Sequence, residues 1–402
     1  MGHKLPTEFE QAIPVMNKIR EAGFEAYFVG GCVRDLLLGT PIHDIDIATN
    51  AFPQEIKGIF PRTIDVGIEH GTVLVLYHQN KYEITTFRTE SGYQDFRRPD
   101  EVVFVRKLAD DLKRRDFTIN ALAMTTEGQM IDLFGGQADL QRKIIRAVGE
   151  PQERFHEDAL RMMRAVRFAS QLGFSIEEQT LAAIKDHHAL LHHISVERIQ
   201  IEFIKLMSES KRSIGLTPFL ECGLYESCPG FSNHLTGLTK LMTLPETEIK
   251  KEAVIWTIIA YFLNLKENEV NRFLRAWKLS NQLIKTVGTI LPAYHYRLHD
   301  FWTPLTVYPL SREEVIMVEE MLALTNQTGR LSEALACYDG LTIHSLKDLS
   351  ISGADILAST KKKPGPWVGE LLEEVEEKVI LKDLPNDSQR LMQYVSERGD
   401  SK

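Results

Sequence analysis

Two carboxylates stand one residue apart at the end of an apolar stretch of this chain. The stretch reads FVGGCVRDLLLGTPIHDIDIAT, from Phe28 to Thr49, and the two residues are Asp44 and Asp46. Because strand side chains alternate, both carboxylates would share one face while the flanking isoleucines enter the core. Carboxylates that close repel one another unless a cation bridges them, and their oxygens suit Mg²⁺. We therefore predict a two-metal site that activates an attacking hydroxyl and stabilises a leaving pyrophosphate.

The residues just upstream suit the binding of a phosphate group. Gly30 and Gly31 allow the backbone to approach a phosphate closely at the start of a helix. Arg34 follows one turn later and can bind the same phosphates through two of its nitrogens. A solvated loop is the alternative, because D-x-D and G-G pairs are each common in turns. The complete string is far more specific than either pair alone.

A second group of charges lies in the segment RFHEDALRMMRAVRF. Helical spacing predicts that Asp158 and Arg161 lie one turn apart on one face. An ionised Asp only accepts hydrogen bonds and an Arg only donates them, so the pair fits cytosine and adenine and rejects uracil and guanine. Arg164 and Arg167 extend the basic row. The alternative is a solvated helix face on which Glu157 pairs with these arginines.

Two further stretches supply candidate ligands. RRDFTINA contains Arg115, which could hold a triphosphate or a base, and Asp116 and Asn120, either of which could meet a ribose 2′-hydroxyl. Glu83, in YEITTF, is either a third metal-binding carboxylate on a neighbouring strand or a charge on an edge strand. By contrast, KDHHALLHH lacks an H-E-x-x-H pattern and reads as the end of a helix rather than a metal site.

The elements that must position these residues change in type along the chain. Up to about residue 150, the runs AYFVG, DIDIAT, TVLVLYH, YEITTF and VVFV predict strands, and YHQNKYE predicts a hairpin. CVRDLLL and PQEIKGIF predict short helices, and the polar FRTESGYQDFRRP reads as a mobile loop. Beyond that point helical spacing dominates, as in the buried helix AVIWTIIAYFL and the solvated face GELLEEVEEK. We predict an α+β fold, with a mixed sheet followed by an all-α remainder.

The composition is that of an ordinary globular protein. The 402 residues are 43% hydrophobic and 26% charged. With a typical domain size of about 150 residues, this length suggests two to four domains. No apolar run approaches the ~18 residues of a membrane span, and the start lacks an apolar signal core, so we expect a cytoplasmic protein. The formal charge of −9 says little about an enzyme. Cys32, Cys222, Cys228 and Cys337 form no C-x-x-C and support neither a zinc site nor disulfides.

Together these stretches resemble the motifs of the nucleotidyltransferase superfamily that includes DNA polymerase β, in the form found in class II tRNA nucleotidyltransferases and bacterial poly(A) polymerases. RRDFTINA is similar to the ribose-recognition motif and IDLFGGQADL to the hinge between head and neck. EDALRMMRAVRF is similar to the nucleotide-selecting motif, and SVERI to the motif that supports its helix. The resemblance is strong over about the first 210 residues and weaker beyond. The uninterrupted order of the motifs argues against chance agreement.

The resemblance implies an enzyme that adds the 3′-terminal CCA of tRNA without a template, from CTP and ATP with two Mg²⁺ ions. It implies a catalytic head over residues 1–150, a nucleotide-selecting neck over 151–212, a body over 213–310 and a tRNA-binding tail over 311–402. Asp44 and Asp46 would be the catalytic metal ligands. The implied nucleotide-binding residues are Gly31, Arg34, Arg115, Asp158, Arg161, Arg164 and Arg167, with Gly30, Glu83, Asp116 and Asn120 as further candidates.

The implied partner is the 3′ end of tRNA with its acceptor and TΨC region. No membrane is expected, and the choice between a monomer and a homodimer stays open. Lys361–Lys363, before a Pro-Gly-Pro turn, either contact RNA phosphates or form a basic surface loop. In the family that the chain resembles, a flexible loop at the position of 87–99 is tied to the switch from C to A addition, so the resemblance implies complete CCA addition rather than a CC-only relative.

Two alternatives to a CCA-adding enzyme remain from the sequence. One is a bacterial poly(A) polymerase, although such enzymes often carry a basic C-terminal extension and this chain ends YVSERGDSK. The other is an RNA-binding protein without chemistry. A degraded relative of that kind should have lost Asp44, Asp46 or Arg161, and all three are present.

Overall fold

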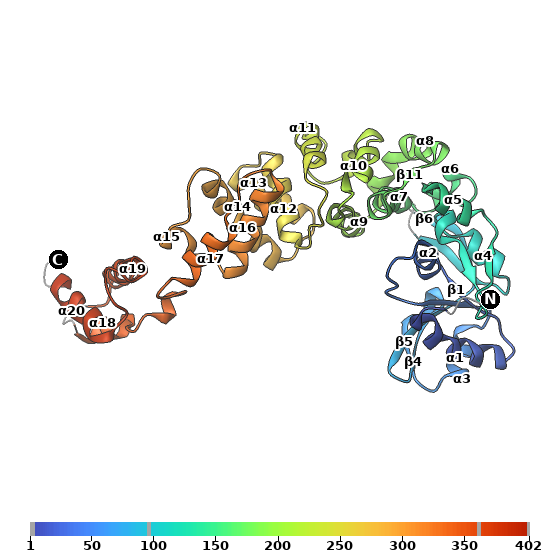
Figure 1. The fold of residues 1–402 in the computed structure, drawn as a ribbon, viewed down its shortest axis with the longest axis horizontal. Coiled ribbons are helices and arrows are strands. Elements are labelled where there is room, and N and C mark those ends of the chain that lie inside the picture. The colour runs from blue at the N-terminus through green and yellow to red at the C-terminus, as the bar shows by residue number, and fades with distance from the viewer. Residues whose placement is uncertain (1–4, 95–97, 360–362, 400–402) are drawn as a thin grey trace. The chain divides into compact units, whose positions relative to one another are not determined.

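Two compact units make up the chain, Met1–Glu248 and Ile249–Lys402 (Figure 1). The computed structural model describes residues 5–94, 98–359 and 363–399. Within these ranges every strand belongs to the first unit, and the second unit is built from helices. The predicted α+β class, with strands first and helices after, is therefore confirmed.

A seven-stranded mixed sheet forms the base of the first unit, in the order β3-β4-β5-β2-β1-β8-β9. β2 and β5 are parallel, whereas the other neighbouring strands are antiparallel. The predicted hairpin is β4–β5, and the sheet is mixed as expected. The strands are β1 (Ala26–Val29), β2 (Asp46–Thr49), β3 (Thr63–Gly67), β4 (Thr72–Tyr77), β5 (Asn80–Thr86), β8 (Leu122–Met124) and β9 (Met130–Asp132).

Helix α1 (Thr7–Glu21) is held on the sheet by one apolar stripe. Its buried residues recur every three or four positions: Phe9, Ala12, Val15, Met16 and Ile19. The ring of Phe9 meets that of Phe28 in β1 edge-on, at a centroid distance of 4.7 Å. This packing fixes the strand that leads into the glycine turn.

The segment expected to be a mobile loop is a two-stranded antiparallel hairpin. β6 (Arg88–Gln94) pairs with β7 (Arg98–Phe104), while 95–97 lie outside the described residues. The prediction of a loop over 87–99 is wrong because the polar residues of β6 lack the apolar alternation that signals a strand, although their backbone groups still pair. The VVFV run, which was predicted as a strand, lies at the end of β7 and confirms that prediction. Phe104 packs against Gly71, where a Cβ would come within 2.8 Å of the ring and φ is +81°.

Helices make up most of the rest of the first unit. They are α2 (Gly31–Leu38), α3 (Pro53–Ile59), α4 (Leu108–Lys113), α5 (Gly136–Arg142), α6 (Pro151–Glu157), α7 (Leu160–Leu172), α8 (Glu178–His187), α9 (Val196–Ser208), α10 (Arg212–Glu221) and α11 (Leu235–Thr239). Among them, α2 and α3 lie against the sheet while α7, α9 and α10 pack on one another. A small parallel pair, β10 (Ile144–Ile145) and β11 (Ser175–Ile176), lies among them. α10 packs closely on α7, since a Cβ at Gly215 would come within 2.1 Å of the Val166 carbonyl oxygen.

The helix expected to run unbroken through RFHEDALRMMRAVRF is interrupted. α6 ends at Glu157, Asp158 adopts an extended backbone with φ −141° and ψ 102°, and α7 begins at Leu160. The prediction of one continuous face is therefore wrong. Helical spacing continues through this segment in the sequence, so periodicity alone gives no sign of the break.

The second unit consists of packed helices. They are α12 (Glu252–Phe262), α13 (Glu267–Ala276), α14 (Asn281–Arg297), α15 (Pro304–Val307), α16 (Arg312–Leu324), α17 (Leu331–Asp339), α18 (Gly353–Ser359), α19 (Trp367–Ile380) and α20 (Ser388–Gly399). α12 is the expected buried helix, and its Trp256 is fully buried. Among the residues that the structure describes, no helix is long and apolar enough to cross a membrane.

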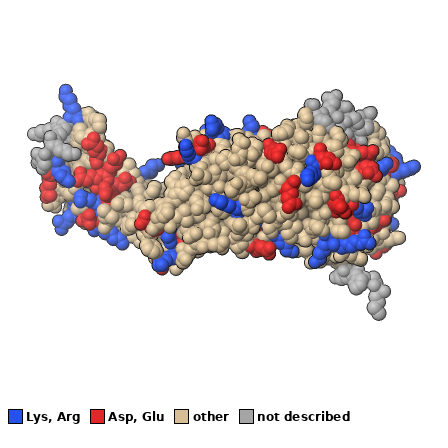
Figure 2. All heavy atoms as spheres, turned by 90° about the horizontal axis from the view of Figure 1, so that it is seen from above, with Lys and Arg blue, Asp and Glu red and all other residues tan. Residues whose placement is uncertain are grey.

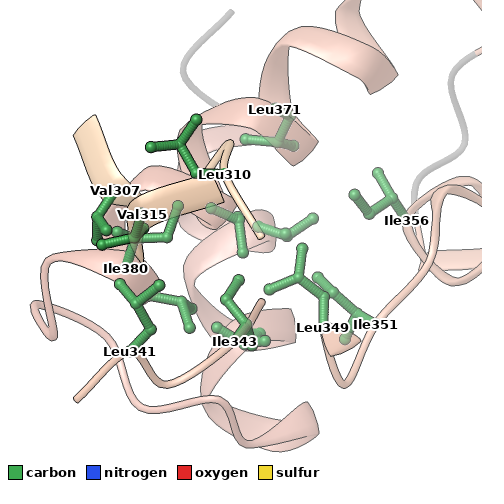
Figure 3. Packing of buried hydrophobic residues seen from close by; sticks show 14 of the residues in the cluster. Val307, Leu310, Val315, Leu341, Ile343, Leu349, Ile351, Ile356, Leu371 and Ile380 are labelled. Carbon is green, nitrogen blue, oxygen red and sulfur yellow. The ribbon is translucent and has the colours of Figure 1, made fainter. Parts of the chain in front are cut away.

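α19 shows how the C-terminal helices divide apolar from charged residues. Glu370, Glu373 and Glu377 are exposed, and Figure 2 shows acidic side chains gathered over the C-terminal part of the second unit. Leu371 and Val375 enter an apolar core together with residues such as Ile356 (Figure 3). The predicted solvated face is confirmed.

Candidate active site

A cavity of about 850 Å³ opens in the first unit. It is lined by all the candidate residues except Asp44 and Glu83, namely Gly30, Gly31, Arg34, Asp46, Arg115, Asp116, Asn120, Asp158, Arg161, Arg164 and Arg167. These residues come from the turn after β1, the start of β2, the segment after α4, and the α6–α7 junction with α7. Tertiary packing thus gathers motifs that lie more than 100 residues apart in the sequence.

The strand carboxylates lie at one edge of this cavity. Asp46 is the first residue of β2 and is the register partner of Glu83 on β5. β5 lies between β4 and β2, so the alternative of an edge-strand charge for Glu83 is wrong. Asp44 precedes the strand rather than belonging to it, which corrects the expectation of two carboxylates on one strand face. All three side chains are exposed.

Crowding among these carboxylates changes the chemistry of Asp46. Desolvation by the surrounding protein raises the pKa of Asp46 to about 6, and the charges of Glu83 and Asp44 add to the shift while Arg115 opposes it. A divalent cation relieves such repulsion, so the oxygen donors fit Mg²⁺. Within the described ranges, no three His, Cys, Asp or Glu side chains already converge as a preformed metal site.

The glycine turn is tightly packed against an arginine. Gly30 has φ +73°, and a Cβ there would lie 2.8 Å from Nη1 of Arg115. α2 begins at Gly31, and Arg34 in this helix is 5% exposed. Its Nε donates to Asp35 Oδ1 at 2.9 Å and its Nη1 to Asn120 Oδ1 at 2.7 Å. The backbone and Arg34 therefore face the cavity in a fixed arrangement.

Asp116 and Asn120 link two of the cavity arginines. Asn120 Nδ2 donates to Asp116 Oδ1 at 3.0 Å, and Arg164 Nε donates to Asp116 Oδ2 at 2.8 Å. Burial raises the pKa of Asp116, but Arg164 and Asn120 outweigh it and hold this pKa well below its usual range. Through Asn120, the network extends from Arg164 to Arg34. In the structure Asn120 and Asp116 accept hydrogen bonds from Arg34 and Arg164 and so hold these arginines in place. The contact of Asp116 or Asn120 with a ribose stays a prediction.

Asp158 and Arg161 both line the cavity, but they do not pair with each other, because each is hydrogen-bonded to other residues. Arg161 donates to Glu157 Oε2 at 2.7 Å and to the carbonyl oxygen of Arg114 at 2.8 Å. Asp158 Oδ2 accepts a hydrogen bond of 3.1 Å from Arg198. The pairing of Glu157 with Arg161 agrees with the alternative reading of this segment. The solvated face in that reading is wrong, because Arg161 and Arg167 are buried.

Arg198 is a cavity residue that the sequence analysis did not single out. It lies in α9, within the SVERI stretch, and its Nη1 is buried without a hydrogen-bond partner among the described residues. Arg114, Arg88 and His70 also line the cavity without having been predicted. The position of Arg198 in a motif already identified as a support for α7 was the signal that could have found it.

The remaining sequence features carry no chemistry at this site. The four cysteines are free, as expected. KDHHALLHH is the end of α8 followed by a 3₁₀ turn, which confirms the helix-end reading. Lys361 and Lys362 lie outside the described residues.

Three family models match successive parts of the chain. One described as the poly A polymerase head domain matches residues 26–146. One described as a probable RNA and SrmB-binding site of polymerase A matches 173–235. One described as tRNA nucleotidyltransferase domain 2 matches 247–395.

Similarity to known proteins extends over the whole chain. The CCA-adding enzyme of Enterococcus faecalis is 53% identical over 394 residues, with 98% of this chain and 97% of that one covered. The CCA-adding enzyme of Latilactobacillus sakei is 50% identical over 390 residues, with coverage of 96% and 97%. The crystal structure of the Bacillus stearothermophilus CCA-adding enzyme in complex with CTP matches with a TM-score of 0.92 at 38% identity, covering 99% of both chains.

Proposed function

Since the chain belongs to the family of CCA-adding enzymes, it adds and repairs the 3′-terminal CCA of tRNA from CTP and ATP, and we propose which residues do so. The enzyme reads no nucleic acid template and releases pyrophosphate at each addition. The cavity carries the proposal, because a strand-end carboxylate, a glycine turn and several arginines converge in it. Phosphoryl transfer needs this combination of positioning and charge neutralisation.

Asp44 and Asp46 hold two Mg²⁺ ions, with Glu83 beside Asp46 as a further ligand. The bound metal supplies activation of the tRNA 3′-hydroxyl and charge neutralisation on the leaving pyrophosphate. The pKa of about 6 at Asp46 supports this assignment, because desolvation and, to a smaller extent, the charges of Glu83 and Asp44 disfavour the bare carboxylate, and a bound cation offsets both. The backbone ladders from β2 to β1 and β5 fix the position of Asp46 at the cavity edge.

The triphosphate lies against the glycine turn. Gly30 and Gly31 allow the backbone at the start of α2 to approach the phosphates, and Arg34 and Arg115 neutralise their charge. Asp116 and Asn120 meet the ribose 2′-hydroxyl while they hold Arg34 and Arg164. Support comes from the shared cavity and from the close packing of Gly30 on Arg115.

The base is selected at the junction of α6 and α7. Asp158 accepts from the amino group of cytosine or adenine, and Arg161 donates to the adjacent ring nitrogen. Arg164 and Arg167 contact the nucleotide or the RNA end. Uracil or guanine would place a carbonyl against Asp158 and an N–H against Arg161, so that acceptor faces acceptor and donor faces donor, which is a strong form of rejection. The fixed positions of Arg161 and Asp158, held by Glu157 and Arg198, support this role.

The helical parts hold the tRNA. We assign a head to residues 1–150, a neck to 151–212, a body to 213–310 and a tail to 311–402. The helical body and tail bind the acceptor and TΨC region and limit growth to a fixed length. We further propose a cytoplasmic location, where tRNA, CTP and ATP occur together. Sedimentation of the purified chain distinguishes a monomer from a homodimer.

One assay tests this function directly, with radiolabelled nucleotides and tRNA that lacks its 3′ CCA. CTP alone should give two additions, and CTP with ATP should give three additions and then stop. Long A tracts from ATP alone would instead identify a poly(A) polymerase. Binding of tRNA without any incorporation would identify the non-catalytic alternative.

A further inference from the structure

One buried carboxylate outside the cavity lining forms ion pairs with two arginines of α7. Glu202 lies on α9, one helical turn after Arg198, and is 6% exposed. Its Oε2 is 2.5 Å from Nε of Arg167, and its Oε1 is 3.9 Å from Nη1 of Arg164. Glu202 itself does not line the cavity, whereas both arginines do. It therefore acts on the cavity only through them.

Arg167 is held from several sides. Its Nη1 donates to Gln171 Oε1 at 2.7 Å, and its guanidinium carbon lies 3.7 Å from the centroid of the Phe168 ring. Burial lowers the pKa of Arg167, and the charge of Glu202 opposes this shift. A buried guanidinium needs a compensating charge, and Gln171 and Phe168 provide none. Glu202 is thus the ionic partner of Arg167 at close range.

The neighbouring carboxylate, Asp116, already has hydrogen-bond partners. Asp116 accepts from Arg164 and Asn120, and through Asn120 the network reaches Arg34 at the glycine turn. The negative charge of Asp116 also acts to raise the pKa of Arg167. Without Glu202, we expect Arg167 to compete with Arg164 for Asp116, because the charge of Asp116 already acts on Arg167. That competition would disturb the arginines on both sides of the nucleotide.

We propose that Glu202 is a positioning residue that sets the affinity of the enzyme for CTP and ATP by holding Arg167 and keeping it apart from the Asp116–Arg164 pair. This inference rests on the proposed function, in which both arginines face the nucleotide. Glu202 touches neither substrate nor metal. Its removal should therefore weaken nucleotide binding without changing which base is preferred, since Asp158 is held by Arg198 instead.

The first test compares Glu202→Gln with the wild-type chain in CCA addition. The KM values for CTP and ATP should rise together by about tenfold, the effect expected when a charged hydrogen bond loses its charge. The value of kcat should stay within about twofold, and the CTP-to-UTP preference should not change. Titration calorimetry with CTP and no tRNA should show the same loss of affinity.

Matched variants separate positioning from general packing. Glu202→Asp keeps the charge and should return KM to within about threefold of wild type. Gln171→Ala removes the neutral partner of Arg167, which itself lines the cavity, and should raise KM less than Glu202→Gln does. In an Arg167→Ala background, Glu202→Gln should add less than about twofold, because its effect passes through that arginine. If Glu202→Gln is unfolded at the assay temperature, the same cycle is measured at a lower temperature at which this variant is folded.

Wild-type KM values in Glu202→Gln, or a lower kcat at unchanged KM, would overturn the inference. So would equal losses in the Asp and Gln variants, or full additivity with Arg167→Ala, since both indicate a packing role. The proposed function is judged independently, by CCA addition in the wild-type chain.

Discussion

The two sides of the cavity differ in how their charges are satisfied. On the strand side, Asp46 and its register partner Glu83 are both exposed on the surface, and desolvation together with the charges of Glu83 and Asp44 raises the pKa of Asp46 to about 6. On the helix side, Arg161 and Arg167 are buried and are held by Glu157 and Glu202. The strand side has like charges close together, whereas the helix side has opposite charges in contact.

This difference teaches which part of the reaction each side serves. Like charges at a strand end are relieved when a cation binds, so in the proposed function the strand side would be completed by Mg²⁺. Paired charges on a rigid helix are oriented before the nucleotide arrives and need no reorganisation. Base selection requires such fixed geometry, because a small shift in a donor or acceptor would admit the wrong base.

The largest expected effect comes from removing the strand-side carboxylates. Asp44→Ala or Asp46→Ala should reduce both C and A addition by about a thousandfold or more, since bound metal contributes several kcal/mol to the transition state. Binding of tRNA, measured by filter retention, should survive. Asp65→Ala on β3, an exposed carboxylate outside the cavity, is the matched control and should retain activity. Near-normal turnover of an Asp44 or Asp46 variant at saturating Mg²⁺ would place the metals elsewhere.

A smaller and more selective effect is expected on the helix side. Asp158→Asn replaces a pure acceptor by a group that also donates, so UTP should become a usable substrate. Arg161→Ala should loosen discrimination among all bases. The change in relative kcat/KM should be about ten- to a hundredfold, measured for CTP, ATP, UTP and GTP.

Asp186→Asn, an exposed carboxylate on α8, serves as the control for these selectivity measurements. Equal loss for all four nucleotides, with an unchanged CTP-to-UTP ratio, would show that the helix side does not read the base. Asp158 and Arg161 would then be structural residues only, and the contrast between the two sides would lose its functional meaning.

The last expected effect is on stability rather than on turnover, and it comes from Asp116. Asp116→Asn should lower the free energy of unfolding at neutral pH by about 2 kcal/mol, because it breaks a buried ion pair whose arginine is only partly buried. The folded chain lowers the pKa of Asp116, so its stabilisation is complete above the ordinary Asp value of about 4 and declines as the pH falls below it. Urea unfolding at several pH values should show the two chains converging in acid.

Glu127→Gln provides the comparison for that stability measurement. Its partner Arg20 lowers the pKa of Glu127 to about 2, but the pair is exposed, and exposed pairs contribute little. An effect of Glu127→Gln as large as that of Asp116→Asn would mean that burial does not decide the strength of these pairs.

Local patterns in the sequence predicted much of the molecule. The β4–β5 hairpin, the glycine turn before α2 and the buried helix α12 follow from alternation, turn residues and apolar spacing within single segments. The candidate residues were chosen from motifs, and most of them line one cavity. These features are encoded within about 20 residues each, which is the range over which periodicity and turn chemistry act.

Contacts between distant segments were decided only by the tertiary structure. Glu83 became the neighbour of Asp46 because β5 pairs in parallel with β2, and spacing along the chain contains no information about that register. Arg161 bonds the carbonyl of Arg114, which is 47 residues away, and Asp158 leaves the helix to meet Arg198 on α9. The residue types thus determined which charges this protein has, whereas packing determined their partners, because an ion pair forms between groups that burial brings together.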